Sequence, residues 1–319
     1  MSSIITITFS PCIDKSTSVS SLIPEKKLKC TLPKLEPGGG GINVARAIKK
    51  LGGLATAIYP AGGYTGKYFN KLLADENVPT IIIETQNETR ENIIILEETT
   101  NQQYRFGMPA TELKQPEWEL ILKTVNEIKD VDFIVASGSL AAGVPVDIFA
   151  RIAGMAKNKK AKFIVDTSGE ALKYAANEGV YLLKPNLAEL SSLVNKDYLQ
   201  QAEIGNAAKQ IIKNGNCEVV VVSMGAAGAM LVAKDITKKY LPPPVKRKST
   251  VGAGDSMVAG IVLSLSKGKS LDESVQYAVA CGTAATMNAG TELCRLQDVE
   301  KLYKAMVADK NSGITKGLS

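Results

Sequence analysis

The chain has 319 residues, 45% apolar and 22% charged, with a formal net charge of +6. This is the composition of a globular protein with enough apolar material for one large or two smaller cores. Histidine is absent, which excludes His-dependent triads, His-ligated metals and a histidine general base. Any acid–base chemistry must therefore come from carboxylates, Lys, Tyr or Cys.

Compartment and partner class are constrained by a few further features. The five cysteines are scattered without metal-site spacing, which predicts reduced thiols. No signal-peptide pattern surrounds Ile4–Phe9 and no apolar run has membrane-spanning length, so a cytoplasmic location is expected. Nucleic acid binding is an alternative for a basic chain. Aromatic residues are only 5%, however, and no long basic tract occurs, which favours phosphorylated metabolites over nucleic acid or membrane.

The N-terminal region predicts a strand followed by a small separate sheet. Ile4–Phe9 is rich in β-branched residues and predicts an opening strand. Asp14 follows it, either as a turn residue or, because ligands gather at strand ends, as an acceptor for sugar hydroxyls. Residues 15–37, with alternations such as Leu28–Leu32, and Arg90–Phe106 predict short strands beside the main body. Their outer face would need cover, which a second subunit could supply.

Four consecutive glycines, Gly38–Gly41, directly precede an amphipathic helix that carries Val44 and Ile48 on one face. A flexible linker would not run straight into such a helix, so a ligand cradle is favoured. Neither a Walker P-loop nor a G-x-G-x-x-G dinucleotide motif is present.

Strands and helices alternate after residue 106, which predicts a mainly parallel sheet covered by helices on both faces. The valine-rich strand Val219–Ser223 predicts a central parallel strand buried on both sides. The other predicted strands are Phe133–Ala136, Lys162–Val165 and Tyr181–Lys184, and the predicted helices include Val146–Lys159, Ala171–Asn177, Leu187–Val194, Gln201–Lys213 and one opened by the capping box Ser270–Glu273.

Residues that follow two of the predicted strands are candidates for nucleotide binding. Asn186 and Glu189 are three residues apart, on one face of a helix. A carboxamide and a carboxylate there suit either a hydrated Mg²⁺ or a structural cap. Ser223, Gly225 and Gly228 follow the valine strand and either line an adenosine pocket or turn the chain.

The segment Thr250–Ser256 combines two glycines and an aspartate at the predicted start of a helix. At the start of a helix, the backbone N–H groups of Gly252, Ala253 and Gly254 could bind an anion. Asp255 is then either an ordinary cap or a base that takes a proton from a hydroxyl attacking a phosphoryl group.

Together, Gly38–Gly41 with Asn43 and Gly252–Asp255 resemble the two signatures of the ribokinase-like (PfkB) carbohydrate kinases, and the match extends from Ser10-Pro11 to Asn288–Thr291. The resemblance implies an α/β fold: a ribokinase-like three-layer α/β/α sandwich with a mainly parallel central sheet and a small β-sheet lid. It divides the chain into an α/β domain (1–14, 36–89 and 107–319) and a discontinuous lid (15–35 and 90–106) that would form a homodimer interface.

The implied activity is glycolytic: ATP-dependent phosphorylation of fructose 6-phosphate at the 1-hydroxyl to fructose 1,6-bisphosphate. Kinases of tagatose 6-phosphate and fructose 1-phosphate often carry Lys at the position of Gly40, so the resemblance favours fructose 6-phosphate. Those two activities and a non-catalytic sugar-phosphate sensor remain alternatives.

The resemblance also implies roles for individual residues. Asp255 would be the general base, and the amides of Gly252, Ala253 and Gly254 would hold the transferred phosphoryl group. Lys29 replaces an Arg, and Leu-Ala-Ala-Gly replaces a proline-containing turn after Ser139. The substrate would be bound by Asp14, Gly39, Gly40, Asn43, Arg90 and Ser139, with Lys27 from a second subunit.

ATP would be bound by Lys184, Asn186, Ser223, Gly225 and Gly228, with Mg²⁺ held through water by Asn186 and Glu189. A monovalent cation such as K⁺ would lie near Ser249, Val251, Ala285, Asn288 and Gly290.

Overall fold

The computed structural model describes residues 3–215 and 217–315, and these form a main sheet and a separate lid sheet. Within the described residues the main sheet has nine strands in the order β13-β12-β11-β10-β9-β8-β1-β4-β5. All neighbours from β11 to β5 pair in parallel, whereas β12 and β13 are antiparallel. The strands are β1 (Ile4–Ile7), β4 (Thr56–Gly62), β5 (Thr80–Thr85), β8 (Phe133–Ser137), β9 (Lys162–Asp166), β10 (Val180–Leu183), β11 (Cys217–Ser223), β12 (Ala229–Ala233) and β13 (Ile236–Tyr240).

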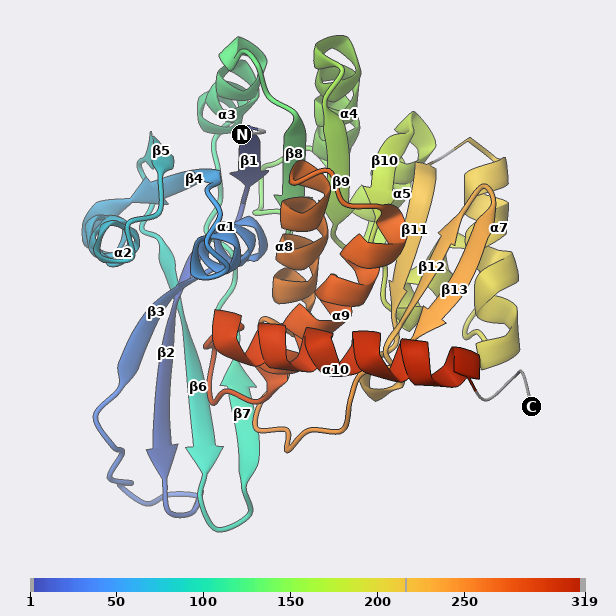
Figure 1. The fold of residues 1–319 in the computed structure, drawn as a ribbon. Helices are drawn as coiled ribbons and strands as arrows, with labels where there is room; N and C mark the ends of the chain where they lie inside the picture. The colour runs from blue at the N-terminus through green and yellow to red at the C-terminus, as the bar shows by residue number, and fades with distance from the viewer. Residues whose placement is uncertain (1–2, 216, 316–319) are drawn as a thin grey trace.

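Helices cover both faces of this sheet, which confirms the expected three-layer α/β/α architecture (Figure 1). Two apolar clusters, one on each face, form the core. The first face is covered by α1 (Gly40–Lys50), α2 (Gly63–Asp75), α8 (Ala253–Ser266), α9 (Leu271–Thr286) and α10 (Leu296–Thr315). The second is covered by α3 (Gln115–Glu127), α4 (Ile148–Lys159), α5 (Gly169–Glu178), α6 (Leu187–Leu193) and α7 (Ile204–Lys213).

The lid is a four-stranded sheet in the order β3-β2-β6-β7 that extends away from the main body (Figure 1). Its strands are β2 (Cys12–Val19), β3 (Lys34–Gly38), β6 (Arg90–Glu97) and β7 (Gln102–Phe106). The lid strands thus extend beyond the expected range 15–35, since β2 begins at Cys12 and β3 ends at Gly38. Pro11 lies between β1 and β2, and proline cannot continue a strand ladder as a donor.

Three sequence-based expectations were wrong in detail. Asp14 does not end the opening strand but lies inside β2 of the lid, because the chain leaves the main sheet at residue 8. The alternation Leu28–Leu32 forms an irregular loop, and Leu32 is 95% exposed. Strand β11 has a parallel neighbour on one side only, because residues 229–240, after the glycine-rich turn, form the antiparallel hairpin β12–β13.

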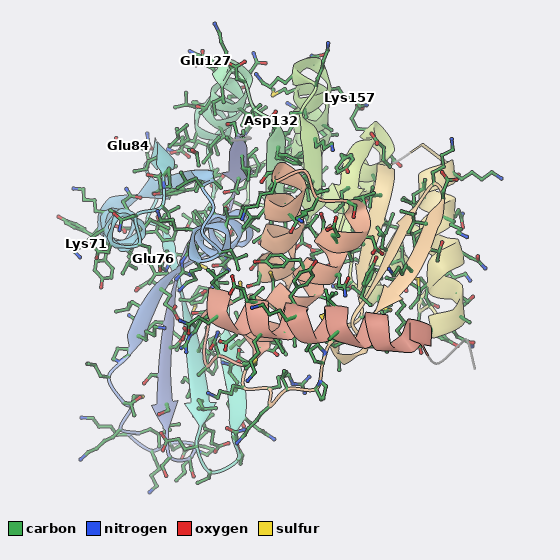
Figure 2. All side chains as sticks on the ribbon, viewed as in Figure 1. Lys71, Glu76, Glu84, Glu127, Asp132 and Lys157 are labelled. Carbon is green, nitrogen blue, oxygen red and sulfur yellow. The ribbon has the colours of Figure 1, made fainter. Side chains whose placement is uncertain are left out.

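A buried ion pair fixes the base of the lid to the main domain. Arg46 of α1 is 1% exposed and donates to Glu76, which follows α2, and to Glu36 of β3. Figure 2 shows Glu76 beside α1 and α2. Arg46 also donates to the backbone oxygen of Pro37, 2.7 Å away. The lid base is therefore held by one guanidinium with several acceptors. Among the helices described, none is long and apolar enough to cross a membrane.

Candidate active site

A cavity of about 300 Å³ lies between the lid and the ends of the main-sheet strands. It collects six of the seven residues expected to bind the sugar phosphate: Asp14, Gly39, Gly40, Asn43, Arg90 and Ser139. The seventh, Lys27, lies in the exposed loop between β2 and β3 and is not among the lining residues.

The lid wall of this cavity carries four polar side chains on β2 and β6, in addition to Arg105 of β7. Cys12 and Asp14 on β2 pair in register with Arg90 and Asn92 on β6. Residues two apart on a strand share a face, so all four face the same way. Burial raises the pKa of Asp14, while hydrogen bonds from Asn92 and Cys12 and the charge of Arg90 oppose the rise.

The glycine run serves backbone packing as well as the cavity. A Cβ added to Gly40 would lie 2.4 Å from the carbonyl carbon of Ser137, and one on Gly41 would lie 2.5 Å from the oxygen of Ile7. Gly39 has φ of +112°, a conformation that favours glycine. These glycines let the start of α1 touch the ends of β8 and β1, so Asn43 is placed beside the cavity.

Asp255 lies in the first turn of α8 and is fixed by two side chains. Asn43 Nδ2 donates to its Oδ2 at 3.0 Å, and Ser137 Oγ donates to its Oδ1 at 3.3 Å. Burial, together with the negative charge of Asp166, raises the pKa of Asp255 to about 7, against the opposing effects of Asn43, Lys184 and Ser137. A carboxylate with such a pKa is suited to act as a general base near neutral pH.

An ion pair lies close to the same helix end. Lys184 Nζ is 3.1 Å from Asp166 Oδ1, and a Cβ on Gly254 would lie 3.6 Å from Lys184 Nζ. Burial lowers the pKa of Lys184, but the charges of Asp166, Glu189 and Asp255 outweigh this and leave it raised. Gly252, the N-cap of α8, has φ of +72°. The first N–H groups of α8 have no partners within the helix, so this end can accept an anion.

The pair Asn186 and Glu189 forms a reciprocal capping box at the start of α6. Asn186 N donates to Glu189 Oε2 at 2.8 Å, and Glu189 N donates to Asn186 Oδ1 at 2.9 Å. This capping box is the structural alternative that the sequence offered to Mg²⁺ binding. The other carboxylate oxygen of Glu189 can still accept a hydrogen bond from a water bound to Mg²⁺. Among the side chains of residues 3–215 and 217–308, no group of three or more Cys, Asp or Glu could hold a metal ion directly.

The other predicted nucleotide residues lie on the neighbouring strand end. Asn186 and Ser223 form an isolated parallel bridge, so the ends of β10 and β11 are adjacent. Gly225 and Gly228 have positive φ, and a Cβ on Gly228 would overlap the backbone oxygen of Tyr240. Gly228 therefore has a packing reason that is independent of any ligand.

The expected monovalent-cation residues meet where two loops touch. Ser249 Oγ donates to the oxygen of Gly290 at 2.7 Å and accepts from Val251 N at 3.2 Å. Asn288 N donates to the oxygen of Ala285 at 3.2 Å. Backbone oxygens are hard donors of the kind that alkali cations prefer.

The sequence reasoning missed several site residues. Ser137 and Asp166 directly follow the predicted strands Phe133–Ala136 and Lys162–Val165, and this position was the available signal. Asn92 and Cys12 were missed because their role depends on β2 pairing with β6, which are 80 residues apart in sequence. Arg105 of the lid donates to Thr250 at 3.1 Å and was also missed.

The fold, the anion-accepting helix end and the fixed carboxylate define a carbohydrate kinase. The model of the pfkB family carbohydrate kinases matches residues 5–298, and the chain belongs to this family. The chain is 46% identical over 301 residues to the ATP-dependent 6-phosphofructokinase isozyme 2 of Escherichia coli (strain K12), covering 94% of this chain and 97% of that protein.

Solved structures agree with this assignment. The crystal structure of phosphofructokinase-2 from Escherichia coli in complex with potassium has a TM-score of 0.93 and 45% identity, covering 96% of this chain and 100% of that one. The complex of the same enzyme with fructose-6-phosphate has a TM-score of 0.91 and 44% identity, with the same coverage.

Proposed function

We propose that this protein is an ATP-dependent 6-phosphofructokinase that transfers the γ-phosphoryl group of ATP to the 1-hydroxyl of fructose 6-phosphate. The observation that carries the proposal is the place of Asp255. Its carboxylate contacts Asn43 at the sugar cavity, and it stands in the first turn of α8, whose N-terminus lies beside Lys184. The base thus lies where the two substrates would meet.

In this arrangement each end of the site has a distinct task. Asp14 accepts hydrogen bonds from sugar hydroxyls, and the guanidinium of Arg90 binds the existing phosphate with Ser139. Asp255 removes the proton from the attacking hydroxyl. The N–H groups at the start of α8 and the charge of Lys184 stabilise the negative charge of the phosphoryl group in transit.

Mg²⁺ bound to ATP would be held through water by Asn186 and Glu189, and would neutralise phosphate charge. K⁺ would bind the backbone oxygens near Ser249 and Gly290. This placement is supported by the contact of the two loops and by the potassium complex of the similar E. coli enzyme.

The lid would pair with a second copy of the chain. Large apolar side chains on or beside the lid are exposed, among them Ile23, Leu32 and Phe106 at 50%, 95% and 47%. Burying them between two lids would stabilise a homodimer. Lys27, which does not line its own cavity, would then reach the cavity of the second subunit.

The test is a substrate comparison. ADP release is measured with fructose 6-phosphate, fructose 1-phosphate and tagatose 6-phosphate at equal concentrations. The highest kcat/KM is expected with fructose 6-phosphate. A clear preference for either of the other sugars would overturn the assignment, and no turnover with any of them would favour a sensor.

A further inference from the structure

The side-chain amide of Asn92 joins the two ends of the sugar-phosphate cavity. Nδ2 donates to Asp14 Oδ1 at 3.0 Å and to the sulfur of Cys12 at 3.1 Å. Oδ1 accepts from Met108 N at 3.1 Å and from Arg90 at 3.3 Å. One amide therefore contacts the expected hydroxyl acceptor and the expected phosphate anchor together.

The orientation of this amide is dictated by its neighbours. The N–H of Met108 and the guanidinium of Arg90 are donors only, so they require the oxygen of Asn92. The nitrogen must then face Asp14, whose ionised carboxylate accepts only. Arg90 is itself held by the backbone oxygen of Met108 at 2.8 Å. The hydrogen bonds among Asn92, Asp14 and Arg90 therefore allow only one orientation of the Asn92 amide.

We propose that Asn92 is a positioning residue for sugar-phosphate binding: its amide holds the Asp14 carboxylate and the Arg90 guanidinium in one fixed geometry. The inference rests on the proposed function, because it assigns the cavity to a sugar phosphate. It adds a residue whose action on the substrate passes through Asp14 and Arg90.

A consequence concerns the protonation of Asp14. The ionisable groups that face Asp14 are Cys12 on its own strand, Arg90 on β6 and Arg46 on α1. Glu36 is its register partner on β3, but the Glu36 carboxylate is bound by Thr291, Lys34 and Arg46. The hydrogen bond from Asn92 is the largest influence that opposes the burial-raised pKa of Asp14.

Removing the amide must therefore raise the pKa of Asp14 further. A carboxylic acid that protonates at higher pH loses its acceptor capacity for sugar hydroxyls at higher pH. The binding defect of an Asn92 variant should consequently grow as the pH falls. A merely structural defect would be the same at every pH.

The experiment uses two variants, Asn92→Leu and Asn92→Asp. The first removes all four hydrogen bonds of the amide. The second keeps the acceptor for Met108 and Arg90 but puts a carboxylate beside Asp14, so that the two carboxylates compete for one proton. Asn101→Asp is the matched control, because it adds the same charge to the same lid in an exposed turn with φ of +53°, which Asp tolerates.

The dissociation constant of fructose 6-phosphate is measured by calorimetry between about pH 5.5 and 8.5, a range that spans titration of a raised carboxyl. The ratio of variant to unsubstituted enzyme cancels the titration of the substrate phosphate. A loss of roughly 10- to 100-fold is expected near neutral pH, the size expected for a hydrogen bond to a charged group. The ratio should rise toward acid pH, while ATP affinity changes by less than about twofold, within ordinary surface effects.

A double-mutant cycle with Asp14→Asn completes the test. In the Asp14→Asn background, Asn92→Leu should lose the pH-dependent part of its effect, because no titrating carboxylate remains. A pH-independent ratio, or an equal pH dependence in both backgrounds, would overturn the positioning role. If the unsubstituted enzyme binds no fructose 6-phosphate, the proposed function fails instead.

Discussion

Lys184 and Asp166 form an ion pair of 3.1 Å beside the N-terminus of α8, with side chains only 5% and 15% exposed. Both charges act on Asp255: Asp166 raises the pKa of the base and Lys184 lowers it. Because the two effects oppose one another, removing either Lys184 or Asp166 should shift the pKa of Asp255 in a predictable direction.

The acid limb of kcat/KM should follow these charges. Asp255 acts as a base only when ionised, and its pKa of about 7 predicts that kcat/KM falls as the pH drops below neutrality. Lys184→Met should move this limb to higher pH, and Asp166→Asn should move it to lower pH. Shifts in the same direction for both variants, measured over the full pH profile, would contradict the assignment.

Lys184→Met should also weaken catalysis strongly. Loss of a donor aimed at developing charge costs roughly 10²–10³-fold in kcat. Lys157→Met is the control, since Lys157 makes an exposed ion pair with Glu178 on the outside of α4 (Figure 2). That control should leave kcat and both KM values unchanged.

The variant Asp255→Asn should lose roughly 10²–10⁴-fold in kcat, the usual contribution of a positioned base. The amide is isosteric, and it removes a charge that is repelled by Asp166, so the thermal midpoint should not fall. ATP affinity, measured by calorimetry, should be retained. Near-normal turnover would exclude Asp255 as the base.

The sequence predicted the main sheet better than the lid. Local apolar runs identify β8 to β11 because those strands are buried on both faces and their pattern needs no partner. The lid strands are half exposed and pair across 80 residues, so neither the register of Asp14 with Asn92 nor the start of β2 at Cys12 follows from local pattern.

The sequence predicted the parts of the site that consist of short motifs, and it missed the parts that depend on contacts between distant segments. Gly252–Asp255 and Asn186–Glu189 are short motifs at helix starts, and the sequence could place them. Ser137 contacts Asp255, and Asp166 contacts Lys184. These contacts depend on the order of strands in the sheet, which a local sequence pattern does not predict. The hairpin β12–β13 was missed because Gly225 and Gly228 were interpreted as an adenosine pocket or a turn, and no strand was predicted between them and Thr250.

Gly40→Ala tests whether the glycine run is required for packing. Its Cβ would lie 2.4 Å from a backbone carbon of Ser137, and backbone cannot yield as a flexible side chain can. A destabilisation of roughly 1–3 kcal/mol is expected, as for other overpacked sites. Gly154→Ala, inside α4, is the control: apart from the adjacent residues and the nearby backbone of its own helix, no atom lies within 4 Å of that added Cβ.

The two alanines should therefore have opposite effects. At Gly154, alanine should stabilise the protein by about 0.4–1 kcal/mol, because it lowers the entropy of the unfolded chain in a helix-compatible position. Thermal unfolding of both variants gives the comparison. A neutral Gly40→Ala would show that α1 can shift away from β8 at little cost.

Arg46→Met tests the attachment of the lid to the main domain. Methionine fits the volume but leaves the carboxylates of Glu36 and Glu76 without their guanidinium. Breaking a buried pair from one side costs about 3–5 kcal/mol, and because Glu76 is 31% exposed, the lower end is expected. For a chain of this size that corresponds to a fall in the thermal midpoint of roughly 4–6 °C.

The triple variant Arg46→Met, Glu36→Gln, Glu76→Gln separates a lost attraction from a stranded charge. If uncompensated carboxylates cause the loss, neutralising them should recover a large part of it, since apolar or neutral replacements of a whole buried pair are often tolerated. Arg151→Met, which breaks the exposed pair with Asp147, should change stability by less than about 1 kcal/mol. No recovery in the triple variant would mean that Arg46 stabilises the lid through Pro37 and the packing of its stem, not through its charge.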